Sequence, residues 1–191
     1  MVILRNSFIL PVLLIAFDLA TFGQSNSAQV KSIKKEFQAI NRDSTLKKVV
    51  LENEEFLGEN IGDGGGKLVG FFKNHTVRKI SQWLGLSNGI EIKEYYFKDG
   101  QLVFVYEVFK SFEYDQTRNQ MDYNKISTTF EGRYYFKNGK LIDQLVKGQN
   151  RHDELLTPGD LLIEEALYNL KLLKRKITLL TILIEKRKTH Y

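Results

Sequence analysis

The sequence predicts an α+β fold, an antiparallel β-meander of six to seven strands with an N-terminal and a C-terminal helix packed on it. The first observation is an octapeptide that occurs twice, YYFKDGQL at 95–102 and YYFKNGKL at 134–141. Each copy places Asp-Gly or Asn-Gly between apolar residues, which is the strongest short-range signal for a β-hairpin. The second observation is apolar spacing of three and four residues near both ends of the chain, which is typical of amphipathic helices.

The first 23 residues have the layout of a secretory signal peptide. Residues 8–17 form an apolar run, and Thr21 and Gly23 are the small residues that precede a cut. The run is shorter than the roughly 20 apolar residues that span a membrane. We therefore expect an exported protein, periplasmic or secreted, with a single domain at 24–191. An uncleaved anchor or a buried N-terminal helix is the alternative.

The segment 24–45 predicts the N-terminal helix. Val30, Ile33, Phe37 and Ile40 are separated by three or four residues, which places them on one helix face. Lys34, Lys35 and Glu36 lie on the opposite side. This helix is expected to pack on the sheet through its apolar face.

Three hairpins make up the predicted meander at 46–148. The third is a degraded copy, FFKNHTV at 71–77, in which Asn74 and His75 occupy the turn. Histidine is among the few non-glycine residues enriched at positive φ, so it suits the same turn. The predicted strands are 66–73, 76–83, 90–98, 101–110, 129–137 and 140–147, with LKKVVLENEEFL at 46–57 as a candidate seventh.

The two-residue turns also predict the register of the strands. Counting outward from each turn gives the pairs Phe97–Leu102, Tyr96–Val103, Tyr95–Phe104, Phe136–Leu141, Tyr135–Ile142 and Tyr134–Asp143. In the strand 101–109, apolar residues point both ways, with Leu102, Phe104, Tyr106 and Val108 on one side and Val103, Val105 and Phe109 on the other. A strand that is apolar on both sides is covered on both sides.

The segment 158–188 predicts the C-terminal helix. It begins with Pro158-Gly159 and with Asp160 as a candidate N-cap, and its apolar residues recur every three or four positions. The stretch ITLLTILI at 177–184 is apolar on nearly all sides and fits a helix or a strand. Basic residues flank this stretch, so 171–188 is a candidate for peripheral contact with an anionic membrane. The alternative is a helix packed on the sheet with its basic face in solvent.

The composition excludes several classes of chemistry. The chain has no cysteine, so it has neither disulfides nor thiolate metal ligands nor a cysteine nucleophile. Its net charge of +5 is spread along the sequence, which gives no indication of nucleic-acid binding. No motif for a cofactor occurs, and none is expected.

Three segments resemble a group of small exported proteins of Bacteroidetes-type bacteria. They are GDGGGKLVGFFKN at 62–74, WLGLSNGIEIKEYYFKDGQLVFVYE at 83–107 and TFEGRYYFKNGKL at 129–141. The hairpins are also similar to MORN-like repeats, although the regular period and tandem glycines of those repeats are missing. The resemblance covers roughly 46–146, and it implies an exported protein without implying any catalytic residue.

Two sets of residues are candidates for a site. Aromatic side chains on the meander could contact a ligand, and the candidates are Tyr95, Tyr106, Tyr134 and Tyr135. Carboxylates in two polar segments could hold a cation such as Ca²⁺, and these are Glu59, Asp63, Asp115 and Asp122. The alternatives are core tyrosines and solvated acidic loops. If the segments 58–66 and 111–128 meet at one rim of the sheet, we expect a site there.

The function that these observations favour is an exported, non-enzymatic binding or interaction protein, with a protein or small-molecule ligand in the cell envelope. One alternative is a carboxylate-dependent hydrolase of the envelope, with its carboxylates in the segment 54–63. That alternative requires at least two carboxyl groups to converge in a cleft, one of them with a raised pKa. Another alternative is a membrane-surface protein that acts through its basic C-terminal helix.

Overall fold

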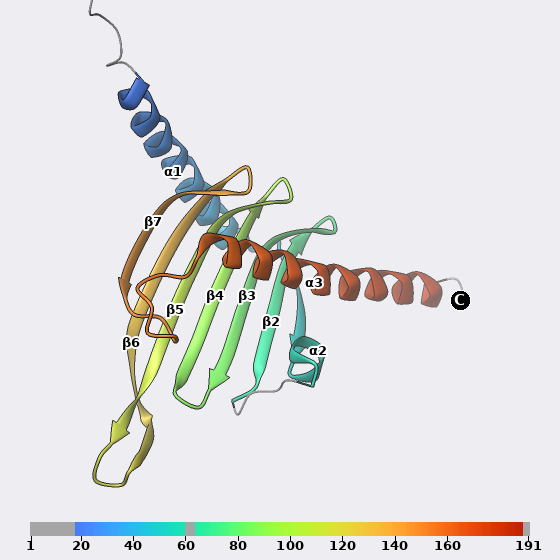
Figure 1. Cartoon of the computed structure of the whole chain (residues 1–191). Coiled ribbons are helices and arrows are strands. Elements are labelled where there is room, and N and C mark those ends of the chain that lie inside the picture. Colours follow the sequence, from blue (N-terminus) through green and yellow to red (C-terminus); the bar gives the residue numbers. More distant parts are fainter. Residues whose placement is uncertain (1–17, 60–63, 189–191) are drawn as a thin grey trace, which may run out of the picture.

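The computed structural model describes residues 18–59 and 64–188, and it confirms the α+β fold (Figure 1). The predicted signal peptide lies mainly outside the described residues, and 18–23 belong to the first helix. Seven antiparallel strands follow one another in spatial order: β1 (Lys47–Glu52), β2 (Gly66–Lys73), β3 (Thr76–Leu86), β4 (Gly89–Lys98), β5 (Gln101–Asp115), β6 (Gln120–Lys137) and β7 (Lys140–Gly148). The helices are α1 (Asp18–Arg42), α2 (Glu54–Leu57) and α3 (Gly159–Lys188).

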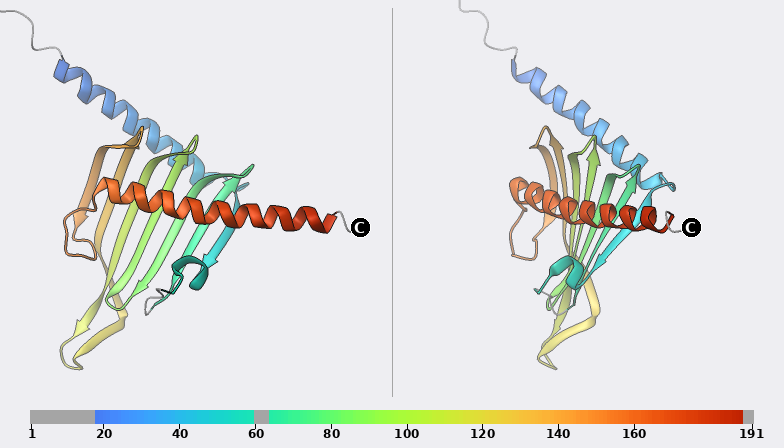
Figure 2. Two further views of the ribbon diagram at one scale, coloured as in Figure 1. Left: turned by 45° about the vertical axis from the view of Figure 1, so that its right-hand side comes forward. Right: turned by 90° about the vertical axis from the view of Figure 1, so that its right-hand side faces the viewer.

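The helices α1 and α3 pack on opposite faces of the sheet (Figure 2). Each tyrosine doublet of the repeated octapeptide serves both faces, because neighbouring residues on a strand point in opposite directions. Tyr95 and Tyr134 are buried on the α3 face, whereas Tyr96 and Tyr135 are buried on the α1 face. The expectation that the sheet is covered on both sides is therefore confirmed.

The three predicted turns are confirmed. Their central residues all have positive φ, as a type I′ turn requires: Asn74 and His75 at 49° and 64°, Asp99 and Gly100 at 50° and 78°, and Asn138 and Gly139 at 51° and 70°. The predicted pairs nearest two of the turns, Phe97–Leu102 and Phe136–Leu141, are also correct.

The predicted pairing farther from the turns is wrong by one residue. Tyr96 pairs with Phe104, and Tyr135 pairs with Asp143, so that Val103 and Ile142 are extra residues in β-bulges. The third hairpin has the same irregularity, with Arg78 as the extra residue. Because each bulge reverses the direction of the following side chains, Leu102 shares the α3 face with Val105 and Phe109, and not the face of Phe104.

Four segments differ from their predicted structure or resolve an ambiguity. The segment 111–124, predicted as a loop, continues β5 and β6 as a hairpin. Only the first half of 46–57 forms a strand, and α2 follows it. The stretch 177–184 is helical, and α3 begins at Gly159, so Asp160 lies in its first turn and not at its N-cap.

The degenerate turn offers a direct test of this local account. Replacing His75, which holds φ at 64°, with glycine should raise the free energy of unfolding by about 1 kcal/mol, because glycine has no Cβ to strain in the left-handed region. The reverse change, Gly139→His, should lower it by a similar amount, since nothing lies within 4 Å of the added Cβ and only the conformational cost acts. Urea unfolding of both variants measures this, and a change of the same sign in the free energy of unfolding for both variants would contradict it.

Candidate functional site

A row of polar side chains crosses the α3 face of the sheet, where apolar packing would be expected. Gln82 on β3 pairs with Lys93 on β4, and Lys93 pairs with Glu107 on β5. All three are buried, with 2%, 5% and 2% of their surface exposed. Glu91, two residues before Lys93 on the same face, is also 2% exposed. Buried charges are stable only when they are paired, so this row has to be satisfied by partners.

The Lys93 ammonium group lies among three carboxylates. Its Nζ is 2.9 Å from Glu165 Oε2, 3.4 Å from Glu91 Oε2 and 3.7 Å from Glu107 Oε1. Burial alone would lower the pKa of Lys93, but the charges of Glu91, Glu165 and Glu107 together outweigh burial and raise the pKa. Lys93 is therefore held in its charged form.

Two residues of α3 reach down to this row. Gln82 donates to Glu165 Oε1 at 2.7 Å and accepts a hydrogen bond from Asn169 Nδ2 at 2.6 Å. Burial would raise the pKa of Glu165, but the Lys93 charge and the hydrogen bonds from Lys93 and Gln82 lower it. Four residues apart on one helix, Glu165 and Asn169 share a face, so the two contacts fix how α3 is rotated.

The segment between β7 and α3 closes the other side of the cluster. Thr157 donates its hydroxyl hydrogen to Glu107 Oε1 at 3.1 Å, and its backbone N–H donates to the Tyr134 hydroxyl at 3.0 Å. Arg151 lies 3.3 Å from Glu91 Oε1. The buried Asn150 shapes this segment, because its side-chain oxygen accepts the backbone N–H of His152 at 2.9 Å and that of Glu154 at 3.1 Å.

These elements enclose a cavity of about 310 Å³. Its lining includes the buried Glu91, Lys93 and Glu107, and its exposed residues include His152, Glu154, Leu161 and Glu164. Five glutamates line it, against one lysine and one arginine, so the cavity carries an excess of negative charge.

Two carboxylate oxygens in the cavity lining accept no hydrogen bond among the described residues, Glu91 Oε2 and Glu107 Oε2. Glu91 Oε2 still has the Lys93 ammonium at 3.4 Å as an ion-pair partner, so Glu107 Oε2 is the less satisfied of the two. Burial raises the pKa of Glu107, and the nearby Lys93 charge and the Thr157 hydrogen bond only partly oppose this. A buried carboxylate oxygen without a donor is costly, so the site is chemically suited to a ligand that brings N–H donors and positive charge.

The four tyrosines predicted as candidate ligand contacts do not form an exposed patch on one face of the sheet. Tyr95, Tyr134 and Tyr135 are buried, in agreement with the alternative that they are core tyrosines, because each fills a core under a helix. Tyr134 still touches the polar cluster through Thr157, and burial raises its pKa to about 12. Tyr106 is half-buried on the opposite face, where its hydroxyl donates to Glu131 at 3.0 Å beneath the Arg133 guanidinium.

The predicted cation ligands are not gathered into one site. Asp115 and Asp122 lie on the β5–β6 hairpin, and Arg118 between them makes contacts of 2.6 Å and 3.1 Å to the two carboxylates. Glu59 is exposed, and Asp63 lies outside the described residues. Within 18–59 and 64–188, no cluster of three or more His, Asp or Glu side chains has the arrangement of a metal site.

The described carboxylates of the segment 54–63, assigned to a hydrolase in the alternative hypothesis, lie at the surface. Glu54 and Glu59 are exposed, and Glu55 forms an ion pair with Lys176 of α3. The convergent carboxyl groups that the hypothesis required occur instead at Glu91 and Glu107. One sequence feature could have indicated this site. Glu107 lies within the apolar strand 101–109 and points to the same side of the sheet as the buried Val105 and Phe109.

Gly64, from the described part of the segment 58–66, and the β5–β6 hairpin lie together at one rim of the sheet, where the sequence predicts a site if the two segments meet. Gly64, Trp83, Phe112 and Tyr123 line a second cavity of about 320 Å³. Its lining is aromatic and apolar apart from Ser87, and it lacks the convergent polar groups that orient a ligand. The polar cavity under α3 is therefore the better candidate.

Comparison of the chain with protein-family models, with curated proteins and with solved structures finds no match.

Removing the central cation should destabilise the fold strongly. Lys93→Met leaves Glu91, Glu107 and Glu165 without their shared partner, and breaking a buried ion pair in this way costs about 3–5 kcal/mol. Urea unfolding at neutral pH measures the loss, with the exposed Lys140→Met as the matched control. A loss below 1 kcal/mol, similar to that of the control, would contradict the account.

The same variant should also change the acid response. The pKa of Glu165 is lowered from its ordinary value of 4.5, so this carboxylate contributes stability above pH 4.5 that is lost as pH falls through its folded-state pKa. Lys93→Met removes the main attraction behind that shift. The stability difference between the variant and the parent chain should therefore narrow on acidification, and a constant difference would contradict this origin.

Proposed function

We propose that this chain is a non-enzymatic binding protein, exported as its N-terminal sequence indicates, and that it takes a small cationic ligand in the cavity under α3. The observation that carries the proposal is a buried carboxylate oxygen in the lining of that cavity, Glu107 Oε2, that accepts no hydrogen bond among the described residues. Beside it, Glu91 Oε2 also accepts no hydrogen bond and has the Lys93 ammonium at 3.4 Å. An ammonium or guanidinium group would supply both N–H donors and compensating charge.

The excess of carboxylates supports a cation over an anion. Lys93 and Arg151 offset part of the negative charge of the lining, and an added cation would offset more. The volume of about 310 Å³ suits a compact molecule, at the lower end of known ligand pockets. The exposed rim residues His152 and Glu154 lie where such a ligand would enter.

A hydrolase that uses Glu107 as its acid is the second candidate, favoured by the raised pKa of this residue beside another carboxylate. The ammonium of Lys93 lies 3.4 Å from Glu91 and 3.7 Å from Glu107, so both groups face a fixed cation. This arrangement fits charge recognition better than proton transfer, because the cation favours the ionised form of each carboxyl group.

Methylguanidinium and methylurea form a matched pair of probes, since they have similar shapes and differ in charge. Calorimetric titration at low millimolar concentration should show binding of methylguanidinium and at least tenfold weaker binding of methylurea. Glu107→Gln should weaken methylguanidinium binding by about tenfold or more, because a neutral acceptor replaces a charged one. Glu113→Gln, on the exposed hairpin, is the control and should leave binding unchanged.

Equal affinity for the charged and neutral probes would remove the cation proposal. Circular dichroism of Glu107→Gln separates loss of binding from loss of folding. If instead a glycoside or ester probe were turned over by the parent chain and not by Glu107→Gln, the hydrolase would replace the binding protein.

A further inference from the structure

The cavity involves only the beginning of α3, and the second half of the helix has features of its own. The helix crosses the sheet and continues beyond β1, so that its end projects from the body of the protein (Figures 1 and 2). The residues that hold it to the sheet recur every three or four positions and are buried: Leu162, Ala166, Leu170, Leu173 and Ile177. This spacing forms one continuous stripe along the helix.

The apolar stripe continues after the sheet ends. Leu180 follows Ile177 by three residues on the same side of α3, yet 41% of its surface is exposed. Leu179 and Ile182 are 58% and 43% exposed and point in other directions, since successive residues turn by about 100° around the helix. The projecting segment therefore exposes apolar side chains on several sides.

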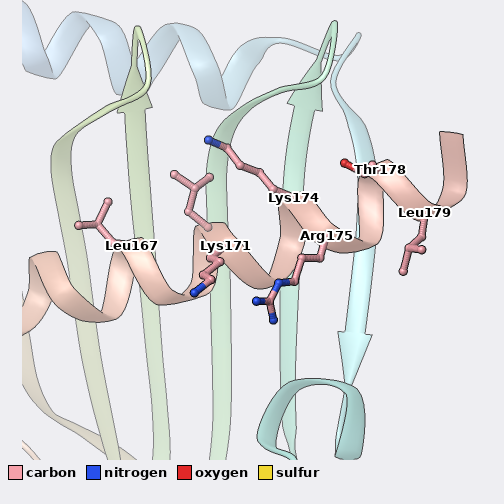
Figure 3. Close-up of a pocket in the computed structure, with 7 residues that line it drawn as sticks. Leu167, Lys171, Lys174, Arg175, Thr178 and Leu179 are labelled. Atoms are coloured by element: carbon pink, nitrogen blue, oxygen red, sulfur yellow. The ribbon is translucent and has the colours of Figure 1, made fainter. Parts of the chain in front are cut away.

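Basic side chains precede this segment along the same helix. Lys171, Lys174 and Arg175 are exposed, and with Leu167 and Leu179 they line a shallow groove on α3 (Figure 3). From 171 to 188 the sequence holds seven basic residues and one acidic residue, Glu185. Leucine and isoleucine next to a row of cations are the composition of helices that lie in the headgroup layer of anionic membranes.

We propose that the exposed side of residues 171–188 on α3, which includes the projecting end of the helix, docks on an anionic lipid surface. The positive charge opposes pairing of this segment with a second copy of itself. Apolar residues on several sides suit a fluid layer of acyl chains, whereas a protein groove takes one helix face. Among the described helices, none is long and apolar enough to span a bilayer. Residues 177–184 would be about 12 Å long at the rise of an α-helix, which suits insertion along the interface.

Fluorescence of a single tryptophan on α3 tests this in the full-length chain. The chain has one tryptophan, so Leu180→Trp is made in a Trp83→Phe background. Its emission should shift to shorter wavelength with vesicles of phosphatidylglycerol and phosphatidylcholine, and not with phosphatidylcholine alone. Leu145→Trp on β7, at a position that is 61% exposed against 41% for Leu180, is the control reporter and should not shift. Because the reporter sits on α3, the apolar N-terminal run does not contribute to the signal.

Removing basic residues tests the electrostatic contribution to lipid binding. The triple change Lys171→Gln, Lys174→Gln and Arg175→Gln should raise the lipid concentration at half-maximal shift by about 100-fold, since each cation contributes about fivefold near an anionic surface. A control triple with the same net charge, Lys137→Gln, Lys140→Gln and Lys147→Gln, should have little effect.

An unchanged emission of Leu180→Trp with anionic vesicles would overturn the proposal, as would an equal shift of the β7 reporter. A shift without vesicles that grows with protein concentration would assign this surface to a second copy of the chain. A shift on addition of a soluble acidic polypeptide, and none with vesicles, would assign it to a protein partner.

Discussion

The position of α3 depends on one buried cation. Apolar stripes hold a helix to a sheet, but they allow it to slide and rotate, since apolar contacts have no direction. The Lys93 ammonium, with Glu165 at 2.9 Å above it and Glu91 and Glu107 beside it, is directional and admits one placement of the helix. The Gln82–Asn169 hydrogen bond fixes a second point one turn later. A buried network of this kind specifies an arrangement more than it adds stability.

The cavity follows from that placement. Glu165 of α3 accepts from Lys93, whereas Thr157 and Arg151 in the preceding segment contact one oxygen each, Glu107 Oε1 and Glu91 Oε1. Glu107 Oε2 is left without a hydrogen-bond donor among the described residues. Charges from the strands, the helix and the connecting segment meet there because the β-meander brings β3, β4 and β5 side by side under one helix. The projecting end of α3 is a separate consequence of the same geometry, since a helix of 30 residues is longer than the part of the sheet that it crosses.

Local backbone requirements made much of the fold predictable. The dipeptides Asp99-Gly100 and Asn138-Gly139 can be interpreted from sequence because positive φ selects few residue types. The bulges at Val103 and Ile142 could not be predicted. These strands are apolar on both sides, so the side-chain pattern fits either register until it is known which helix covers each face. The burial of the tyrosine doublets could not be predicted for the same reason, since it depends on two helices from opposite ends of the chain.

The polar cluster escaped prediction for a physical reason. Glu91 and Lys93 alternate with Ile90 and Ile92, a pattern that normally puts the charged side in solvent. Here α3 covers that side, and no local feature of β4 indicates it. Glu107 within an otherwise apolar strand was the one local anomaly, and its partners come from Lys93 on the neighbouring strand and Thr157 before α3.

The most direct test is an NMR titration of the Glu107 side-chain carboxyl, with and without methylguanidinium. The account predicts a pKa above the ordinary 4.5 in the free chain, because burial dominates, and a lower pKa when the cation is bound beside it. An ordinary pKa in the free chain, or one that methylguanidinium leaves unchanged, would contradict the claim that this buried carboxylate binds a positively charged ligand.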